Sequence, residues 1–340
     1  MNYLSTGDMA LTYQLRTHNT QIKQTLSRLS DELTTGVKSD IGKAVQGNFT
    51  TLSALEASRA RLSSYKLAAD QTEIFVTSAQ SALENIQNQA SQIGKSLISA
   101  ASSPAAASAD VALSAAAEAF TSVLSALNTR TNGRYVFAGE DSQTKPFASS
   151  QEILTALAGT VEGMTDPDQI IAAIDAWFDV PASTGETDEF AATAYKGSSV
   201  PAAGIRISDT DTLTFPVTGN DTAIRDTLKG LALAALVSAD VIGGDNDLRS
   251  SLTQSAGLYL TAADTGLATL RGKVGLIEEK IADAQAAQTA EISSIDLAKA
   301  KLLEADPYET ATALEAVETQ LETLYTLTAR LSQLSLTNYL

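Results

Sequence analysis

The chain has 340 residues, with 23 basic and 40 acidic side chains and a formal net charge of −17. A chain this acidic is a poor candidate for binding nucleic-acid phosphates or an anionic membrane surface. It contains no cysteine and one histidine, which excludes disulfides, zinc–cysteine sites, iron–sulfur clusters and any site that needs two imidazoles. We therefore expect no nucleic-acid partner and no membrane partner.

The charge is unevenly distributed along the chain. Residues 1–139 carry a net charge of +1, residues 140–250 carry −12, and residues 251–340 carry −6. Prolines and Gly/Asp/Asn turns also concentrate in the middle. This pattern predicts a mainly α protein in which helices from both ends form a long antiparallel rod, with a small α+β insert at one tip. The predicted parts are a terminal coiled-coil segment (1–45 plus 303–340), a helical rod (46–140 plus 251–302) and an acidic insert (141–250).

The N-terminal arm has helical periodicity. A first apolar stripe predicts an amphipathic helix that stops at Thr35-Gly36. Its members are Leu11, Leu15, Ile22, Leu26, Leu29 and Leu33. Residues 62–97 then keep alternating steps of three and four over five heptads, which predicts a long rod helix that ends before Pro104. A third helix is expected over residues 113–127, stopping near Asn132-Gly133.

The C-terminal arm mirrors the first. Residues 267–302 keep a similar stripe, and Asp306-Pro307 is a strong helix-start signal. The last helix carries a second narrow stripe, made of Leu314, Val317, Leu321, Leu324, Leu331 and Leu334. Two helices that can bury only narrow apolar stripes are marginally stable in water. We therefore expect the terminal helices to pair antiparallel and to become ordered on assembly. These twelve residues are the predicted assembly interface.

The middle of the chain mixes helix and strand signals. Helices are predicted over residues 152–157, 167–178 and 222–237, with Asp166 as the cap of the second. Residues 204–208 and 212–215 alternate like the two strands of a hairpin. Trp177 is expected to pack in the core.

The residues that usually carry chemistry do not form a site. His18 has no second histidine or cysteine to support catalysis or metal binding. Acidic pairs are expected to be solvated turn residues, and no nucleotide-binding or nucleophile motif occurs. The sequence therefore predicts no catalytic residue, no cofactor and no metal. The acidic groups are Asp166/Asp168, Glu186/Asp188/Glu189, Asp209/Asp211 and Asp245/Asp247.

One motif stands out after the third helix. Residues 132–139 read NGRYVFAG, and Pro146-Phe147 follow shortly afterwards. This stretch resembles the NGRY–apolar–FAG…PF segment of bacterial flagellar hook–filament junction proteins, in the flagellin superfamily. The residues that carry the resemblance are Gly133, Arg134, Tyr135, Phe137 and Gly139.

Three further segments resemble the same superfamily. Residues 29–36 read LSDELTTG, and the chain ends in LSLTNYL over residues 334–340, both similar to flagellin-type termini. Residues 195–197 read YKG and precede a short strand-like run. The resemblance therefore spans both arms and the middle.

The resemblance implies a structural protein that joins the hook to the flagellin filament. Such a protein is exported unfolded through the flagellar type III apparatus with an uncleaved signal, and it is extracellular. The implied partners are further copies of the chain in a ring, a neighbouring hook-associated protein on the hook side, flagellin or other filament-side subunits, and an export chaperone on the C-terminal segment.

Three alternatives remain open at this point. A filament-forming flagellin would share the termini. A type III needle-tip-like protein would share the long helical segments but would lack the flagellin-type terminal sequences. An enzyme housed in the insert would need polar groups that converge in a pocket.

Overall fold

The computed structural model describes residues 6–103, 106–179, 188–242 and 245–337. The chain divides into two compact units, of which unit 1 contains Met1–Ser63 and Thr289–Leu340 and unit 2 contains Ser64–Gln288. The predicted mainly α fold with small β elements is confirmed. The three-part division and its boundaries stay a prediction.

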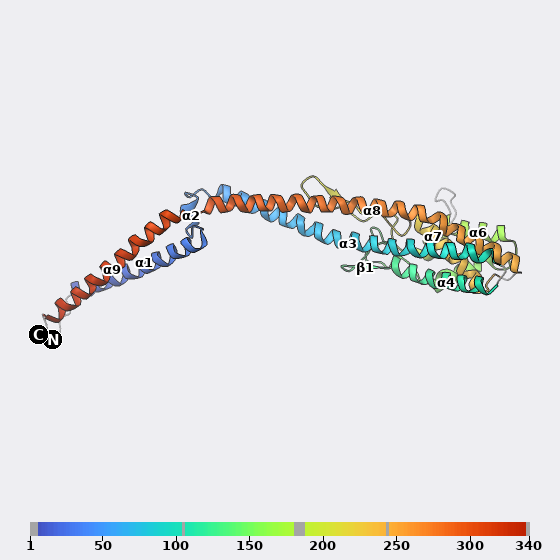
Figure 1. Ribbon diagram of the computed structural model, residues 1–340, viewed down its shortest axis with the longest axis horizontal. Helices are drawn as coiled ribbons and strands as arrows, with labels where there is room; N and C mark the ends of the chain where they lie inside the picture. The colour runs from blue at the N-terminus through green and yellow to red at the C-terminus, as the bar shows by residue number, and fades with distance from the viewer. Residues whose placement is uncertain (1–5, 104–105, 180–187, 243–244, 338–340) are drawn as a thin grey trace. The chain divides into compact units, whose positions relative to one another are not determined.

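Unit 1 is built around the two terminal helices. Helices α1 (Thr6–Thr35) and α9 (Pro307–Thr337) lie side by side and antiparallel (Figure 1). The unit also contains the short helix α2 (Ile41–Ala44), the start of α3 (Thr50–Ala101) and the end of α8 (Asn246–Leu303). The terminal helices of the sequence therefore pair within one chain.

Local sequence signals set the ends of the terminal helices. Helix α1 ends at Thr35, as predicted, and Gly36 follows with a φ of +70°. Helix α9 begins at Pro307, and the Asp306 carboxylate accepts hydrogen bonds from the backbone N–H groups of Tyr308 (2.8 Å) and Glu309 (3.1 Å). These bonds satisfy donors that have no partner inside the helix.

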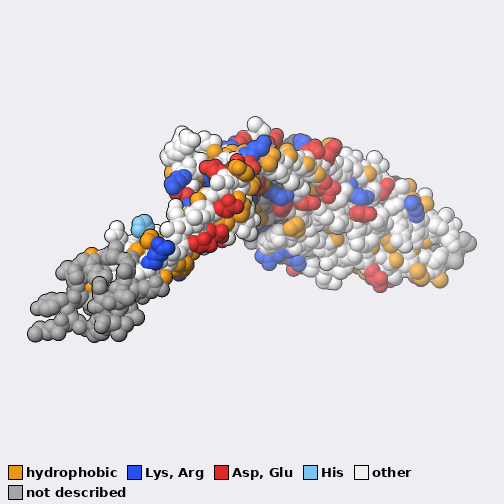
Figure 2. Space-filling model, turned by 60° about the vertical axis from the view of Figure 1, so that its left-hand side comes forward, with side chains coloured by type: hydrophobic (Ala, Val, Ile, Leu, Met, Phe, Trp, Pro, Cys, Tyr) orange, Lys and Arg blue, Asp and Glu red, His pale blue; other side chains and the backbone are white. Residues whose placement is uncertain are grey.

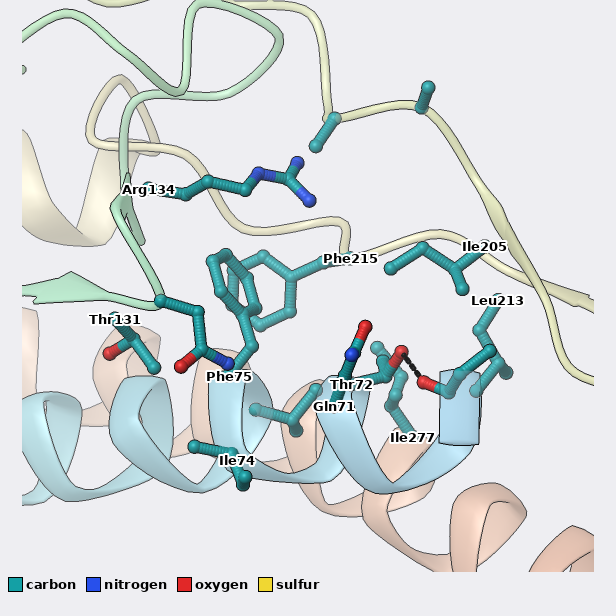
Figure 3. A pocket seen from close by; sticks show the side chains of 15 residues that line it. Gln71, Thr72, Ile74, Phe75, Thr131, Arg134, Ile205, Leu213, Phe215 and Ile277 are labelled. Atoms are coloured by element: carbon teal, nitrogen blue, oxygen red, sulfur yellow. Dashed lines mark hydrogen bonds between the residues drawn. The ribbon is translucent and has the colours of Figure 1, made fainter. Parts of the chain in front are cut away.

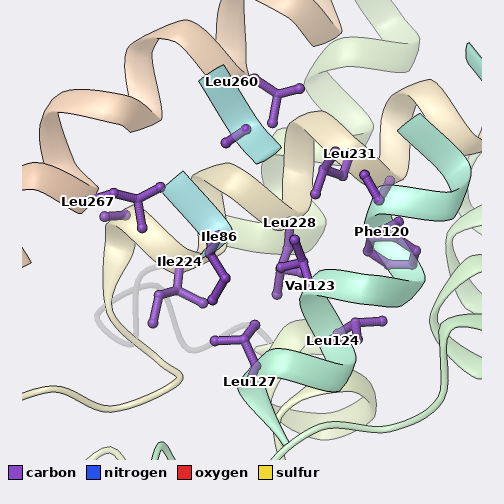
Figure 4. Packing of buried hydrophobic residues seen from close by; sticks show 14 of the residues in the cluster. Ile86, Phe120, Val123, Leu124, Leu127, Ile224, Leu228, Leu231, Leu260 and Leu267 are labelled. Carbon is purple, nitrogen blue, oxygen red and sulfur yellow. The ribbon is translucent and has the colours of Figure 1, made fainter. Parts of the chain in front are cut away.

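The core of unit 2 is a bundle of four helices. Helix α7 (Thr222–Ser238) packs against α4 (Ala106–Leu127), and the middle parts of α3 and α8 complete the bundle (Figure 4). Every residue of α7 from 223 to 237 except Asp226 is buried. A helix that is covered on all sides can be apolar all round, which explains the long apolar run in this part of the sequence.

Helices α3 and α8 approach each other closely at two glycines. A Cβ atom on Gly257 would lie 2.7 Å from Cγ1 of Ile98 and 2.9 Å from the carbonyl oxygen of Gly94. A Cβ atom on Gly94 would in turn lie 3.0 Å from Cβ of Leu260. The absence of side chains at this crossing lets the backbones pack nearly in contact.

The remainder of unit 2 covers one side of this bundle. It contains α5 (Ser150–Val161), α6 (Pro167–Asp179) and a short π-helix, η1 (Phe190–Ala194). A reciprocal cap between Ser149 and Glu152 starts α5, and the Asp166 carboxylate caps α6 as predicted. Trp177 is buried, as expected. The sequence analysis missed η1.

Two small hairpins complete unit 2. Strand β1 (Arg130–Thr131) pairs with β2 (Arg134–Tyr135), and β3 (Ile205–Arg206) pairs with β4 (Thr212–Leu213), both antiparallel. The second hairpin was predicted. The first was not, because Asn132-Gly133 was taken as the end of α4.

The structure corrects that assignment. Helix α4 ends at Leu127, and Asn132 and Gly133 have φ values of 52° and 80°. Two successive residues with positive φ form the tight turn that matches the twist of paired strands, and Asn-Gly is its favoured sequence.

Helix α4 also bears on the expectation of no membrane partner. Residues Ala107–Leu127 are long and apolar enough to cross a membrane by length and composition. The sequence analysis overlooked this because Asp110 and Glu118 interrupt the apolar run of this helix. A core helix passes the same test, and Leu113, Phe120 and Leu127 of α4 are fully buried in unit 2.

Candidate functional sites

Most of the predicted assembly residues whose side chains the structure describes lie on the facing sides of α1 and α9. Leu29 (6% exposed) and Leu324 (9% exposed) are buried, whereas Leu33 is 40% exposed. Leu15, Ile22, Leu26, Leu314, Val317 and Leu321 are half-buried. The side chains of Leu11, Leu331 and Leu334 lie outside the described part of the structure. The helix pair thus has a thin apolar seam, and the role of these residues in assembly stays a prediction.

Two backbone hydrogen bonds, which we call the clasp, join the segment after α1 to the segment before α9. The N–H of Lys38 donates to the carbonyl of Leu303 (2.8 Å), and the N–H of Ala305 donates to the carbonyl of Gly36 (2.9 Å). Beside the clasp, the buried Glu32 carboxylate accepts from Arg28 (2.8 Å) and from the N–H of Ser39 (3.0 Å). Because these hydrogen bonds join defined atoms, they fix the register of α1 against α9.

In unit 2, Phe137 of the NGRYVFAG motif contacts two segments that are distant in the sequence. The backbone carbonyl of Phe137 accepts from the hydroxyl of Tyr195 (3.0 Å) and from the N–H of Gly219 (2.8 Å). The same hydroxyl lies 2.8 Å from the carbonyl oxygen of Ser198. Burial raises the pKa of Tyr195 to about 12. The NGRYVFAG stretch, the YKG stretch and the turn before α7 therefore meet at one phenol. We call this set of contacts the motif knot; the name refers to the contacts and not to a topological knot.

Close packing at Gly139 completes the knot. Gly139 has a φ of +62°, and a Cβ atom there would lie 2.3 Å from the carbonyl oxygen of Ser198 and 2.5 Å from that of Val200. Glu140 donates its N–H to Val200 at 2.9 Å. Phe147 packs against the ring of Tyr195 with centroids 5.3 Å apart. Phe137, Gly139 and Phe147 therefore take part in close packing.

Of the remaining motif residues, Arg134 lies at a groove in unit 2 (Figure 3). Arg134 is stacked 5.7 Å above the ring of Phe75 and donates to the hydroxyl of Ser142 (3.2 Å). The groove has a volume of about 530 Å³ and is bordered by α3, Ile277 of α8, the β1–β2 turn and the β3–β4 hairpin. Its lining is mainly apolar, including Phe75 and Phe215. Tyr135 lies beside Arg130, 5.6 Å from the guanidinium carbon to the ring centroid.

Two buried cations of α7 hold the covering helices in place. The ammonium of Lys229 contacts Asp179 and lies 3.1 Å from Asp175, whose carboxylate also accepts from the hydroxyl of Tyr259 at 2.8 Å. Burial alone would lower the pKa of Lys229, but Asp179 and Asp175 outweigh it and raise that pKa. Because α6 and α8 meet at this one ammonium, Lys229 is a structural crosslink.

Arg225 makes the second set of contacts. It donates to Asp188 (3.1 Å) and to the backbone carbonyl of Phe178, and its guanidinium carbon lies 4.5 Å from the ring centroid of Phe190. The sequence analysis missed both cations. The two cations lie four residues apart, just before the long apolar run that begins at Leu231, and this spacing on one face of a helix is the signal that could have identified them.

The single histidine and the acidic residues were the candidates for catalysis or metal binding. His18, the single histidine, lies on the surface of α1 (Figure 2). Among the described residues, no group of three or more histidine, aspartate or glutamate side chains could hold a metal ion. Asp166, Asp245 and Asp306 instead accept hydrogen bonds at helix starts. These acids therefore have a role in capping.

Comparisons with known proteins bear on the whole arrangement. Residues 259–340 match the family described as the bacterial flagellin C-terminal helical region. No curated protein matches the chain. A solved structure described as that of a flagellar hook-associated protein from Vibrio parahaemolyticus is similar in fold, with a TM-score of 0.52 and 11% identity, over 73% of this chain and 93% of that one. The C-terminal part of the chain is thus flagellin-like in sequence, and the fold is like that of this flagellar protein.

Proposed function

We propose that this chain is an extracellular structural protein of the bacterial flagellum that joins the hook to the flagellin filament. The observation that carries the proposal is the terminal helix pair, whose α9 lies within the region that matches flagellin. The fold similarity to a hook-associated protein and the motif knot support the junction role over the filament role. A structural, non-enzymatic role agrees with the capping and packing roles of the acidic and aromatic residues.

The proposed partners follow from this role. Copies of the chain would form a ring through the terminal helices, between a hook-associated protein on the hook side and flagellin or other filament-side subunits. Before export through the type III apparatus, a chaperone would cover the C-terminal segment. The twelve residues of the two inner stripes, predicted as the assembly interface, would act by pairing α1 with α9 within each assembled copy.

Deletion of the gene tests the proposal. We expect electron microscopy to find hooks without filaments on the cells and flagellin shed into the medium, and the wild-type gene should restore attachment. Normal attached filaments would contradict the junction role. Loss of flagellin from both cells and medium would instead indicate a filament subunit.

A matched pair of variants tests the terminal helices. Leu324→Glu places a charge in the seam between α1 and α9, whereas Leu327→Glu makes the same change at a side chain that is 48% exposed. We expect only the first to abolish filament attachment, since burying an unpaired carboxylate is costly. Equal effects of the two variants would argue against the seam.

A further inference from the structure

Each terminal helix also carries a second stripe, which is exposed. On α1 the stripe consists of Met9, Tyr13, Arg16, Thr20 and Lys23, at alternating steps of four and three. On α9 it consists of Tyr308, Thr312, Glu315, Thr319, Glu322 and Thr326, with the same steps. We call these the α1 outer stripe and the α9 outer stripe. At 100° per residue, each lies more than 100° around its helix from the inner stripe.

The charges of the two outer stripes are opposite and equally spaced. The α1 outer stripe contains two cations, Arg16 and Lys23, and no acid. The α9 outer stripe contains two carboxylates, Glu315 and Glu322, and no base. Both pairs are seven residues apart, which is about 10.5 Å along a helix. In the part of the chain that the structure describes, no ion pair involves any of these four side chains.

The uncharged members of the stripes are suited to burial. The hydroxyl of Thr20 donates to the carbonyl of Arg16 (3.0 Å), and that of Thr319 donates to the carbonyl of Glu315 (2.9 Å). Thr312 and Thr326 make the same bond within α9. A hydroxyl that is already bonded to its own helix loses little when a neighbour displaces water, and the threonine methyl group remains free for packing.

Two tyrosines provide apolar area on these surfaces. Tyr13 is 76% exposed and Tyr308 is 84% exposed. Aromatic side chains contribute strongly to interfaces because they bury a large area and lose few rotamers. Both stripes therefore combine an exposed aromatic anchor, methyl groups and charges of one sign.

We infer that the α1 outer stripe of one copy binds the α9 outer stripe of a second copy. This inference rests on the proposed function and specifies which surfaces meet. The contact joins two different surfaces, so a bound pair still has one free stripe of each kind, and the assembly grows until it closes into a ring or continues as a helix.

The register within one chain gives the axial offset that this pairing needs between two copies. Val37 pairs with Glu304 across the antiparallel ends of the helices. Counted from there, Lys23 lies at the level of Glu318 and Arg16 at the level of Tyr325. Glu315 and Glu322 are then each about one turn away, at 1.5 Å per residue. Neighbouring copies in the same orientation need an axial offset of only about 5 Å to align both charge pairs.

Charge reversal tests the inference. Variant A is R16E/K23E, in which both outer stripes are acidic, and variant B is E315K/E322K, in which both are basic. Light scattering and sedimentation velocity over a concentration and salt series would measure self-association. We expect each variant alone to associate at least about tenfold more weakly than wild type at low salt, because like charges then face each other.

The mixture of A and B provides the decisive measurement. The acidic α1 outer stripe of A is complementary in charge to the basic α9 outer stripe of B. The unchanged acidic α9 outer stripe of A is likewise complementary to the unchanged basic α1 outer stripe of B. An equimolar mixture should therefore regain association, with A and B alternating in the assembly. The controls K95E/K273E and E118K/E279K make the same charge changes at exposed positions of unit 2 and should associate as wild type. Far-UV circular dichroism checks that all variants keep wild-type helicity.

Three results would overturn the inference. They are a wild-type chain that stays monomeric throughout the series, variants A and B that associate as wild type, and a mixture of folded A and B that gains nothing over either alone. The deletion experiment is separate, because filaments that detach in the deletion strain would leave the junction role standing even if the charge test failed.

Discussion

The hydroxyl of Tyr195 lies 3.0 Å from the backbone carbonyl oxygen of Phe137 across 58 residues of sequence. We expect Tyr195→Phe to destabilise unit 2 by about 1–3 kcal/mol, since the carbonyl of Ser198 loses the hydroxyl as a donor and the carbonyl of Phe137 keeps only the N–H of Gly219. Urea unfolding would measure the loss. Tyr135→Phe, at a half-buried tyrosine of the same segment, is the control and should change stability by less than about 0.5 kcal/mol. Equal effects would show that the Tyr195 hydroxyl is unimportant.

The same tyrosine should make stability depend on alkaline pH. Burial raises its pKa from 10.0 to about 12, so between these values the folded chain holds a proton that the unfolded chain has released, and stability falls as pH rises. From pH 9 to pH 11 wild type should lose about 1 kcal/mol more than Tyr195→Phe. Tyr259 and Lys229 also have raised pKa values, so the variant should keep part of the slope. Parallel pH profiles would contradict the assignment.

Much of this fold could be predicted from the sequence because local signals agree with it. Asp306-Pro307 and Asp166-Pro167 start helices as expected, since an aspartate cap and a proline at the first position act within one turn. The heptad steps of residues 62–97 predicted α3, because its inner side packs on other helices along its length.

The missed features depend on contacts that are distant in sequence. Asn132-Gly133 has the same composition at a helix end and in a hairpin turn, and pairing of β1 with β2 decides between them. Helix η1 exists where Phe190 and Tyr195 pack on Phe147, which lies more than 40 residues away. The motif residues were identified by resemblance, whereas the contact of Phe137 with Tyr195 could be found only in the structure.

A glycine comparison tests the packing of the motif knot. Gly139→Ala would place a methyl group 2.3 Å from the carbonyl oxygen of Ser198 at a φ of +62°. Gly133→Ala also forces a positive φ, but its nearest neighbour would be Arg130 at 3.9 Å. We expect about 1 kcal/mol of destabilisation from Gly133→Ala and at least about 2–3 kcal/mol from Gly139→Ala. Thermal unfolding would rank them, and the reverse order would contradict the close packing.

A second glycine comparison tests the crossing of α3 and α8. Gly257→Ala would place a Cβ atom 2.7 Å from Ile98 and should destabilise unit 2 by about 1–3 kcal/mol through overpacking. Gly272→Ala lies in the same helix with no atom within 4 Å, so the higher helix propensity of alanine should stabilise by about 0.5–1 kcal/mol. Opposite signs in denaturant unfolding are expected. Stabilisation by both would show that the helices do not approach closely at Gly257.

Removal of the α9 cap should loosen one helix selectively. Asp306→Ala removes the acceptor for the N–H groups of Tyr308 and Glu309, at a cost of about 1 kcal/mol. Because the seam with α1 is thin, hydrogen exchange should accelerate about fivefold in the first turns of α9. Asp166→Ala is the matched control, since it removes the same kind of cap from α6 and should accelerate exchange there while leaving α9 unchanged. If Asp306→Ala leaves exchange in α9 unchanged, the clasp at Leu303 and Ala305 holds the helix start without its cap.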